Sequence, residues 1–545
     1  MPCVFLLACL MIGFIFFLPQ HDFQQQLAQG DHGRDLYCFK KTFEGKIPYR
    51  DYWWQYGPLM PYYYSLFFRV LGVNIQAVII GQLLLIYLSG VLIFLIARCV
   101  MSAPMALLAS LWYWAFRPQF FYTYSHVGGC VLSLMILYCL LRYYRDSKDF
   151  FLYAGLGAVF ILNLIRLNVG LSCFIAYVLC LFIGNRYQKS QRHFNQKSFA
   201  LAVCVVLAVT TAVYFFLLQG ISASALKQSF PYLASYRQDT SSPEYALSFL
   251  VKIVWKNFTA TWNRKIFAAL LLFAAGYIIC KLRKSPNSEK YAREFKLPFL
   301  FLSIFLILNL HEYLLSSTIF RLTWVFPFCL LIFFLILETA FKQFPRILYI
   351  GLMIFLTFVS GRTLWDQYKD IQFYKQPVNL LHYGETRVYV DNLYLELSRS
   401  QKEKVSLTPY NPWIETVKFT LQFLENADDN RDKRPILAIP YDGLYYFLSG
   451  RDSAVYPLAF FGYINISSED EKNMIRQMEE KGVQWVLLSS RANSTETALG
   501  TFGKDYCPLL AQYLSENFFL KGVVGDWQNP PGFTEGHGIK ILKRK

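Results

Sequence analysis

The stretch Asp31-His-Gly-Arg-Asp-Leu-Tyr37, followed by Gly45-Lys-Ile-Pro-Tyr-Arg-Asp-Tyr-Trp-Trp-Gln-Tyr-Gly-Pro58, is polar and lies between two apolar segments. It combines carboxylates four residues apart with a dense group of Tyr and Trp side chains. Aromatic side chains gather where a membrane meets water. We therefore predict that residues 19–75 form the first outer loop of a membrane protein, with 58–72 as an amphipathic helix lying along the surface.

Apolar runs of membrane-spanning length follow and precede this loop. The chain has 545 residues, 55% of them hydrophobic, and a mean hydropathy of +0.31, which a soluble protein of this length rarely reaches. The sequence predicts an α-helical polytopic membrane protein with about eleven transmembrane helices, several of them short. The runs lie at 2–18, 76–98, 103–117, 127–143, 151–165, 169–184, 198–218, 264–281, 297–310, 319–337 and 346–361.

The basic excess of the chain belongs to its membrane part. Residues 375–545 hold 20 Lys and Arg against 21 Asp and Glu, which leaves 33 basic and 15 acidic residues for 1–374. This balance excludes nucleic acid as a partner, because the polar part of the chain is close to neutral.

The position of the basic residues predicts the orientation. The connections at 142–148, 185–197, 281–296 and 342–346 are all basic, and the positive-inside rule places them in the cytoplasm. The N-terminus is then cytoplasmic, and the residues after 362 lie outside. We expect a bacterial inner membrane, with membrane lipids around the spans.

The C-terminal part is polar and has mixed secondary structure. Leu437-Ala-Ile439 and Trp485-Val-Leu-Leu488 are typical of buried strands, whereas 469–481 and 509–518 are typical of helices. We therefore divide the chain into a membrane module, 1–374, and an α/β soluble domain on the outer face, 375–545. This domain has no Gly-rich phosphate loop and is interpreted as a structural or gating cap.

The twelve cysteines have no spacing typical of a metal site. Most lie in apolar runs and are interpreted as small hydrophobic residues. Cys38 and Cys507 both fall on the predicted outer face, where two free thiols are favoured over a disulfide.

Asp31 and Asp35 are the candidate catalytic residues. A carboxylate near the interface can take a proton from a hydroxyl or an amine, or can hold a metal ion. Residues four apart share a face if the stretch is helical, so the pair could act as a base and an orienting partner. The alternative is that one of them caps a surface helix.

Ionisable side chains also occur at the predicted outer ends of several spans. Arg166 interrupts an apolar run and Arg321 lies just inside another, and such residues are functional candidates unless they only reach back to the interface. His311 and Glu312 could act as ligands or as acid and base groups, or could be ordinary loop polarity. His126 is a weaker candidate of the same kind.

The aromatic side chains of the loop have two interpretations. Tyr49 and Trp54 could stack on the face of a sugar, or could belong to the interfacial aromatic belt. Arg50 and Asp51 are expected to pair with each other and shape the loop.

The pattern Asp-x-Gly, then Gly-x-Ile-Pro-Tyr-Arg-Asp, then Gly-Pro-Leu and a short helix ending in Leu-Gly resembles the first outer loop of the GT-C superfamily. These are integral-membrane glycosyltransferases, among them protein O-mannosyltransferases and the aminoarabinose transferase of lipid A. The resemblance covers the layout of roughly 1–360, and its sharpest motif is 31–72. The soluble region after it also fits the outer-face domain of many members.

The resemblance implies roles for particular residues. Asp31 takes the position of the key carboxylate, whereas the second carboxylate of many members is replaced by His32, so that Asp35 is the candidate substitute. A polyprenyl-phosphate sugar is the implied donor, with Arg166 and Arg321 binding its phosphate. The acceptor is a lipid, a glycan or a protein. Metal use varies in the superfamily, so that a divalent metal stays open and no other cofactor is implied.

We therefore expect an inverting sugar transfer on the outer face of the membrane. Two alternatives are a transporter or flippase of lipid-linked sugars and a non-catalytic envelope assembly protein. A flippase needs charged residues along a path to both faces, whereas the candidates here gather at the outer ends of the spans.

Overall fold

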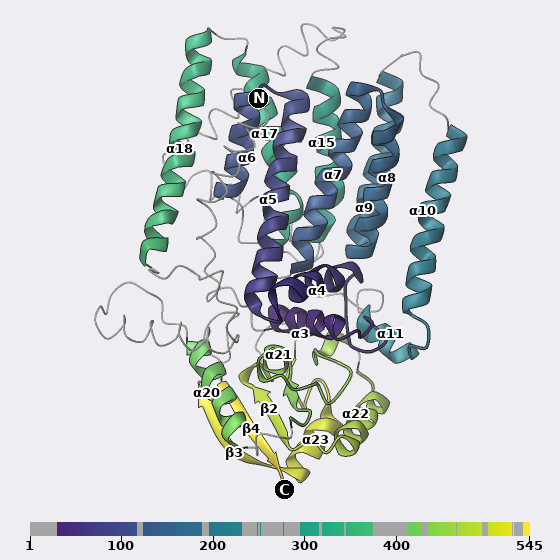
Figure 1. The fold of residues 1–545 in the computed structure, drawn as a ribbon, viewed down its shortest axis with the longest axis vertical. Helices are drawn as coiled ribbons and strands as arrows, with labels where there is room; N and C mark the ends of the chain where they lie inside the picture. Colours follow the sequence, from purple (N-terminus) through teal and green to yellow (C-terminus); the bar gives the residue numbers. More distant parts are fainter. Residues whose placement is uncertain are drawn as a thin grey trace.

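Long helices and a small sheet occupy opposite ends of the molecule, and two short helices lie between them (Figure 1). The chain is seen here in a computed structural model, which describes residues 30–116, 124–187, 196–230, 295–314, 319–342, 345–373, 412–427, 433–464, 466–492, 500–525 and 538–545, together with 248, 251, 276 and 527.

The long helices coincide with the apolar runs. Run 2–18 lies outside the described residues, as does run 264–281 apart from residue 276, and the others are helical. The run at 319–337 is divided, because a 3₁₀ helix precedes a separate α-helix with Pro327 in its first turn. The helices are α5 (Ile75–Val100), α6 (Ala103–Phe116), α7 (Tyr124–Asp146), α8 (Asp149–Ile165), α9 (Leu167–Tyr187), α10 (Gln196–Leu217), α15 (Leu297–Asn309), α16 (His311–Leu314), η4 (Ile319–Trp324), α17 (Phe326–Phe341) and α18 (Arg346–Phe373).

Five of the described helices are long and apolar enough to cross a membrane, at Ala77–Val100, His126–Asp146, Leu167–Arg186, Lys197–Leu217 and Leu297–Leu314. Shorter apolar helices occupy Asp149–Ile165 and Phe326–Phe341. The side chains of Leu201 and Phe215 on α10 are 67% and 69% exposed, and such apolar surface is stable against lipid. The chain is an integral membrane protein, and the number of about eleven spans stays a prediction.

The basic ends of the helices lie together. α7 ends with Arg145 and α9 with Arg186 in the last turn, Lys342 follows α17, and Arg346 opens α18. These ends lie at the top of the bundle in Figure 1, away from the sheet. The arrangement fits the predicted grouping of basic connections on one side of the membrane.

Two short helices, α3 (Asp31–Phe43) and α4 (Leu59–Leu71), run across the other end of the bundle (Figure 1). Asp31 in the first turn of α3 and Lys40 in its last turn both complement the helix dipole. α4 matches the amphipathic helix predicted at 58–72 and ends at Gly72, whose φ of 80° suits glycine. The loop between them, with its Tyr and Trp side chains, is largely buried.

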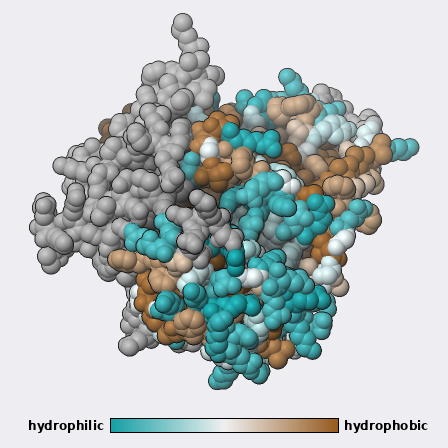
Figure 2. Space-filling view, turned by 60° about the horizontal axis from the view of Figure 1, so that its bottom comes forward, coloured by the Kyte–Doolittle hydropathy of each residue, from teal (hydrophilic) through white to brown (hydrophobic). Residues whose placement is uncertain are grey.

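The C-terminal region, residues 412–545, contains a four-stranded sheet in the order β1-β2-β4-β3. The predicted strands are confirmed as β1 (Leu437–Ile439) and β2 (Trp485–Ser489), which pair in parallel. β4 (Gly538–Arg544) pairs antiparallel with β2 and with β3 (Phe518–Gly525), and these two strands were not predicted. The helices are α20 (Pro412–Ala427), α21 (Leu444–Ser449), α22 (Ser468–Glu480) and α23 (Pro508–Asn517). α22 and α23 confirm the predicted helices. The face of this region that comes forward in Figure 2 is mainly hydrophilic.

The C-terminal region is fixed against α3 by close backbone contacts. A Cβ on Gly33 would lie 2.3 Å from the Leu444 nitrogen, and one on Gly443 would lie 2.8 Å from the Arg34 nitrogen. The Ser453 N–H donates to the Tyr37 hydroxyl over 3.0 Å. Cys38 in α3 and Cys507 before α23 are both buried, free thiols, as favoured from the sequence.

Candidate active site

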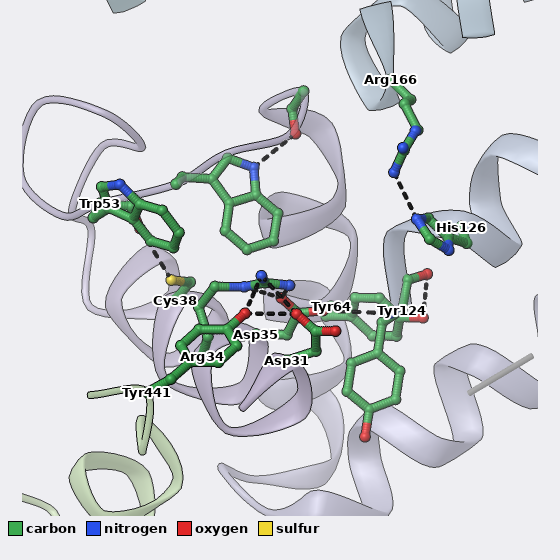
Figure 3. A network of polar contacts seen from close by, with 12 residues as sticks. Asp31, Arg34, Asp35, Cys38, Trp53, Tyr64, Tyr124, His126, Arg166 and Tyr441 are labelled. Atoms are coloured by element: carbon green, nitrogen blue, oxygen red, sulfur yellow. Dashed lines mark hydrogen bonds and ion pairs between the residues drawn. The ribbon is translucent and has the colours of Figure 1, made fainter. Parts of the chain in front are cut away.

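The first two turns of α3 hold one arginine between two carboxylates. Arg34 donates to Asp35 Oδ1 from Nε over 2.8 Å and from Nη2 over 2.6 Å. Its Nη1 donates to Asp31 Oδ1 over 2.9 Å. Arg34 and Asp35 are fully buried, whereas the Asp31 side chain is 21% exposed. We call Asp31, Arg34 and Asp35 the Asp31 centre (Figure 3).

Burial affects the protonation of Asp35. It raises the pKa of this carboxyl to about 7, and the negative charge of Asp31 acts in the same direction, whereas Arg34 opposes the change. The Tyr124 N–H adds a contact of 3.3 Å to Oδ2. Of the two carboxylates, only Asp31 is partly exposed, so it is the one that a substrate can reach.

A second arginine lies at the junction of α8 and α9. Arg166 donates to the fully buried Glu312 from Nη2 over 2.6 Å and from Nε over 3.3 Å. Arg321 Nη1 donates to Glu312 Oε2 over 3.3 Å, and Asn168 also donates to this carboxylate. His311 Nε2 lies 3.6 Å from Glu312 Oε1. The structure therefore brings together four predicted residues from three separate segments. They are Arg166, His311, Glu312 and Arg321.

His126 completes this group. Its Nε2 lies 2.6 Å from Arg166 Nη1, as Figure 3 shows. A guanidinium has no acceptor, so Nε2 must accept and the ring is neutral in this arrangement. We call Arg166, Arg321, Glu312 and His126 the Arg166 centre. It holds two guanidinium groups and one carboxylate, whereas the Asp31 centre holds two carboxylates and one guanidinium.

Tyr56 lies between the two centres. Its ring centroid is 5.1 Å from Arg34 Cζ and 5.1 Å from Arg166 Cζ. The loop that carries it is fixed to α8, since the Gly57 N–H donates to the Ile165 carbonyl over 2.9 Å. A Cβ on Gly57 would lie 2.2 Å from the Leu164 oxygen, so only glycine allows this approach. An acidic and a cationic centre thereby both lie close to one aromatic ring.

The remaining predicted residues lie in the loop between α3 and α4. Trp54 is fully buried, its Nε1 donates to the Gly57 carbonyl over 2.9 Å, and its ring lies 5.7 Å from Arg34 Cζ. Tyr49 is also fully buried and stacks on Phe230 at 5.3 Å. Both therefore pack inside the protein.

Arg50 and Asp51 are paired over 3.1 Å, as predicted, with the Arg50 side chain 49% exposed. The Ile47 N–H donates to Asp51 Oδ2 over 2.8 Å, which shapes the loop.

An apolar cavity of about 460 Å³ lies between α4, α8 and α10. Leu164, two residues before Arg166, contributes to its wall, with further apolar side chains from α4 and α10. Its lining residues are Pro58, Leu59, Tyr62, Leu164, Val209, Ala212, Val213, Phe216 and Leu217. Among the described residues, no three His, Cys, Asp or Glu side chains are grouped in a way that could hold a metal ion.

Sequence reasoning missed several members of the site. Arg34 stands between the two predicted carboxylates, and its i, i+3 spacing from Asp31 was an available signal. Tyr56 belongs to the quoted aromatic stretch, but its spacing does not predict that its ring lies close to both Arg34 and Arg166. Tyr441, whose hydroxyl lies 2.5 Å from Asp31 Oδ1, is 410 residues away in the sequence and had no local signal.

Comparison with known proteins gives matches only at the level of structure, since no family model and no curated sequence matches. ArnT from Cupriavidus metallidurans in the apo state has a TM-score of 0.54 and 12% identity over 98% of this chain and 97% of its own. The same protein bound to undecaprenyl phosphate has a TM-score of 0.53, 11% identity and the same coverage. The Archaeoglobus fulgidus oligosaccharyltransferase with Zn and sulfate has a TM-score of 0.50 and 12% identity over 89% of this chain and 68% of its own.

These likenesses extend over nearly the whole chain, and at such low identity they concern the fold. ArnT and the archaeal oligosaccharyltransferase are both GT-C glycosyltransferases. At the level of the fold the predicted resemblance is confirmed: the chain has the fold of ArnT and of the archaeal oligosaccharyltransferase.

Proposed function

We propose that this protein transfers a hexosyl or pentosyl group from a polyprenyl-phosphate donor to a lipid, glycan or protein acceptor, with inversion at the anomeric carbon. The reaction takes place at the membrane face that carries the C-terminal region. This face is the outer one of a bacterial inner membrane, with the N-terminus in the cytoplasm.

The observation that carries the proposal is the pairing of two unlike centres across Tyr56. The Asp31 centre has an excess of carboxylate and a partly exposed Asp31, which suits a base. The Arg166 centre has an excess of guanidinium, which suits a phosphate, because arginine binds phosphate oxygens in a bidentate manner. Transfer of a sugar from a phosphate needs a base on one side of the anomeric carbon and a phosphate-binding group on the other.

In the proposed step the acceptor oxygen or nitrogen attacks the anomeric carbon while Asp31 takes its proton. The bond from that carbon to the phosphate oxygen breaks, and the polyprenyl phosphate leaves with the electron pair. Arg166 and Arg321 stabilise the charge that develops on this leaving group. Asp35 accepts two bonds from Arg34 and so fixes the guanidinium that also holds Asp31.

Two further features support a lipid-phosphate donor. The apolar cavity beside Leu164 would hold part of a polyprenyl chain whose phosphate reaches Arg166. One of the matched structures, ArnT, is bound to undecaprenyl phosphate. In the present arrangement Glu312 occupies two donors of Arg166, so that the donor phosphate must compete with this carboxylate.

The proposal is tested with the purified protein in vesicles loaded with polyprenyl-phosphate donors that carry radiolabelled sugars. Wild-type protein is expected to move label to an acceptor in a membrane extract, and Asp31→Asn is expected to lose this transfer. Arg50→Gln changes an exposed side chain and serves as the control for purification and for insertion into the vesicles.

A different outcome would identify an alternative. If no donor in the panel is consumed while labelled lipid crosses the vesicle membrane, the protein is a flippase. If neither process occurs and a double variant of Asp31 and Asp35 still supports envelope assembly in cells, the proposed enzyme activity is wrong.

A further inference from the structure

The C-terminal region contributes a side chain to the Asp31 centre. Tyr441 follows β1 after Pro440 and points toward α3, as Figure 3 shows. Its hydroxyl donates to Asp31 Oδ1 over 2.5 Å and accepts from Arg34 Nη1 over 2.5 Å. Since Arg34 Nη1 also reaches Asp31 Oδ1, the three groups form a closed triangle.

This triangle orients the carboxylate. Both donors reach Oδ1 rather than Oδ2, so Asp31 is held by one oxygen at the start of α3. The side chain keeps 21% of its surface exposed. Neither of these two bonds uses Oδ2, and together they give the carboxylate the fixed geometry that a base requires.

The position of Tyr441 is set by the backbone around it. A Cβ on Gly30 would lie 2.1 Å from Tyr441 Cδ1, so the ring fits only against glycine. On the other side, the ring packs edge-on against Phe461 with centroids 5.4 Å apart. The close contacts of Gly33 with Leu444 and of Gly443 with Arg34 prevent the loop from sliding along α3.

We propose that Tyr441 is a positioning residue for the base, so that the site is complete only when the C-terminal region is docked on α3. This inference rests on the proposed function and extends it. The C-terminal region is then part of the catalytic apparatus as well as a cover.

The test compares two Tyr→Phe variants at one interface. Tyr441→Phe removes the hydroxyl that holds Asp31, and Tyr37→Phe removes the one that accepts from the Ser453 N–H. Both leave the neighbouring charges of Arg34 and Asp35 in place. Tyr441→Phe is expected to lower kcat about 10- to 100-fold with donor KM changed less than about threefold, because a misoriented base slows the chemical step. Tyr37→Phe is expected to stay within about twofold of wild type.

The second readout does not depend on transfer. The carboxylate infrared band of Asp31 is isolated by subtracting the spectrum of Asp31→Asn. A hydrogen bond donated to one oxygen of a carboxylate changes the frequency of this band, so Tyr441→Phe is expected to shift the band and Tyr37→Phe to leave it in place.

The outcomes separate the two proposals. If wild type transfers no sugar from any donor, the proposed function fails, whereas the infrared comparison still decides whether Tyr441 holds Asp31. If Tyr441→Phe matches Tyr37→Phe in both kcat and the frequency of the infrared band, Tyr441 is a docking contact only and the inference is overturned. Equal losses of thermal stability and of kcat in both variants would overturn it as well.

Discussion

The Asp31 centre and the Arg166 centre are built from the same chemical groups in opposite proportions. In the first, two carboxylates share one guanidinium, and Asp31 is partly exposed. In the second, two guanidinium groups share Glu312, whose side chain is fully buried. From this difference we infer that the Asp31 centre can receive a proton from an incoming group. The Arg166 centre can bind an anion once Glu312 no longer occupies its arginines.

The largest expected effect on stability comes from a change in the Arg166 centre. Glu312→Gln leaves Arg166 and Arg321 without their shared counter-ion, and an uncompensated buried charge costs about 3–5 kcal/mol. Asp31→Asn is expected to cost less than about 1 kcal/mol, because that carboxylate is partly exposed and Arg34 keeps Asp35. Thermal unfolding in detergent checks the contrast, and equal losses in the two variants would contradict it.

The same variant also tests what the Arg166 centre binds. Removal of the Glu312 charge frees both arginines for an external anion. Undecaprenyl phosphate is therefore expected to raise the Tm of Glu312→Gln more than that of wild type. Undecaprenol, which lacks the phosphate, is the control. A similar rise with the alcohol would show that only the chain is recognised.

The second effect in size concerns the docking of the C-terminal region. Gly33→Ala places a Cβ 2.3 Å from the Leu444 nitrogen, and overpacking against backbone costs about 1–3 kcal/mol. We expect faster proteolytic release of the C-terminal region. Gly157→Ala in α8, where an added Cβ meets nothing within 4 Å, is the control and should leave the release rate unchanged. Unchanged release from Gly33→Ala would show that the docking surface is not tight.

A further effect, different in kind from the others, is a slope of stability with pH. Because burial raises the pKa of Asp35 to about 7, the folded protein binds this proton more tightly than the unfolded chain does. Stability therefore falls as the pH rises from about 4 to about 7 and is level above that range. Asp35→Asn is expected to remove this contribution, seen as a smaller Tm difference between pH 5 and pH 8. Asp51→Asn, at the surface, should keep the wild-type slope, and a full slope in Asp35→Asn would contradict the assignment.

Much of the fold could be predicted because hydrophobic runs and caps are local. The runs at 76–98 and 103–117 became α5 and α6, and the amphipathic segment at 58–72 became α4. β3 and β4 were missed since their pairing depends on distant partners and β3 is largely exposed. The start of α17 at Phe326 was also missed, although Pro327 in its first turn is typical of a new helix.

The candidate site was predicted as separate residues and not as two centres. Asp31, Arg166 and Glu312 are each unusual for their local sequence, so they could be recognised as candidates from the sequence alone. Their partners depend on tertiary structure, since Arg166 and Glu312 are 146 residues apart and Tyr441 is 410 residues from Asp31. The roles of these residues stay predictions.

The central claim is that the two centres divide the reaction, with the Arg166 centre holding the donor and Asp31 acting as the base. The most direct test measures donor binding and transfer in the same preparation of Asp31→Asn. We predict a donor Kd within about threefold of wild type and transfer lowered about 100- to 10,000-fold, the usual contribution of a general base. Full transfer by this variant, or loss of donor binding together with transfer, would contradict the account.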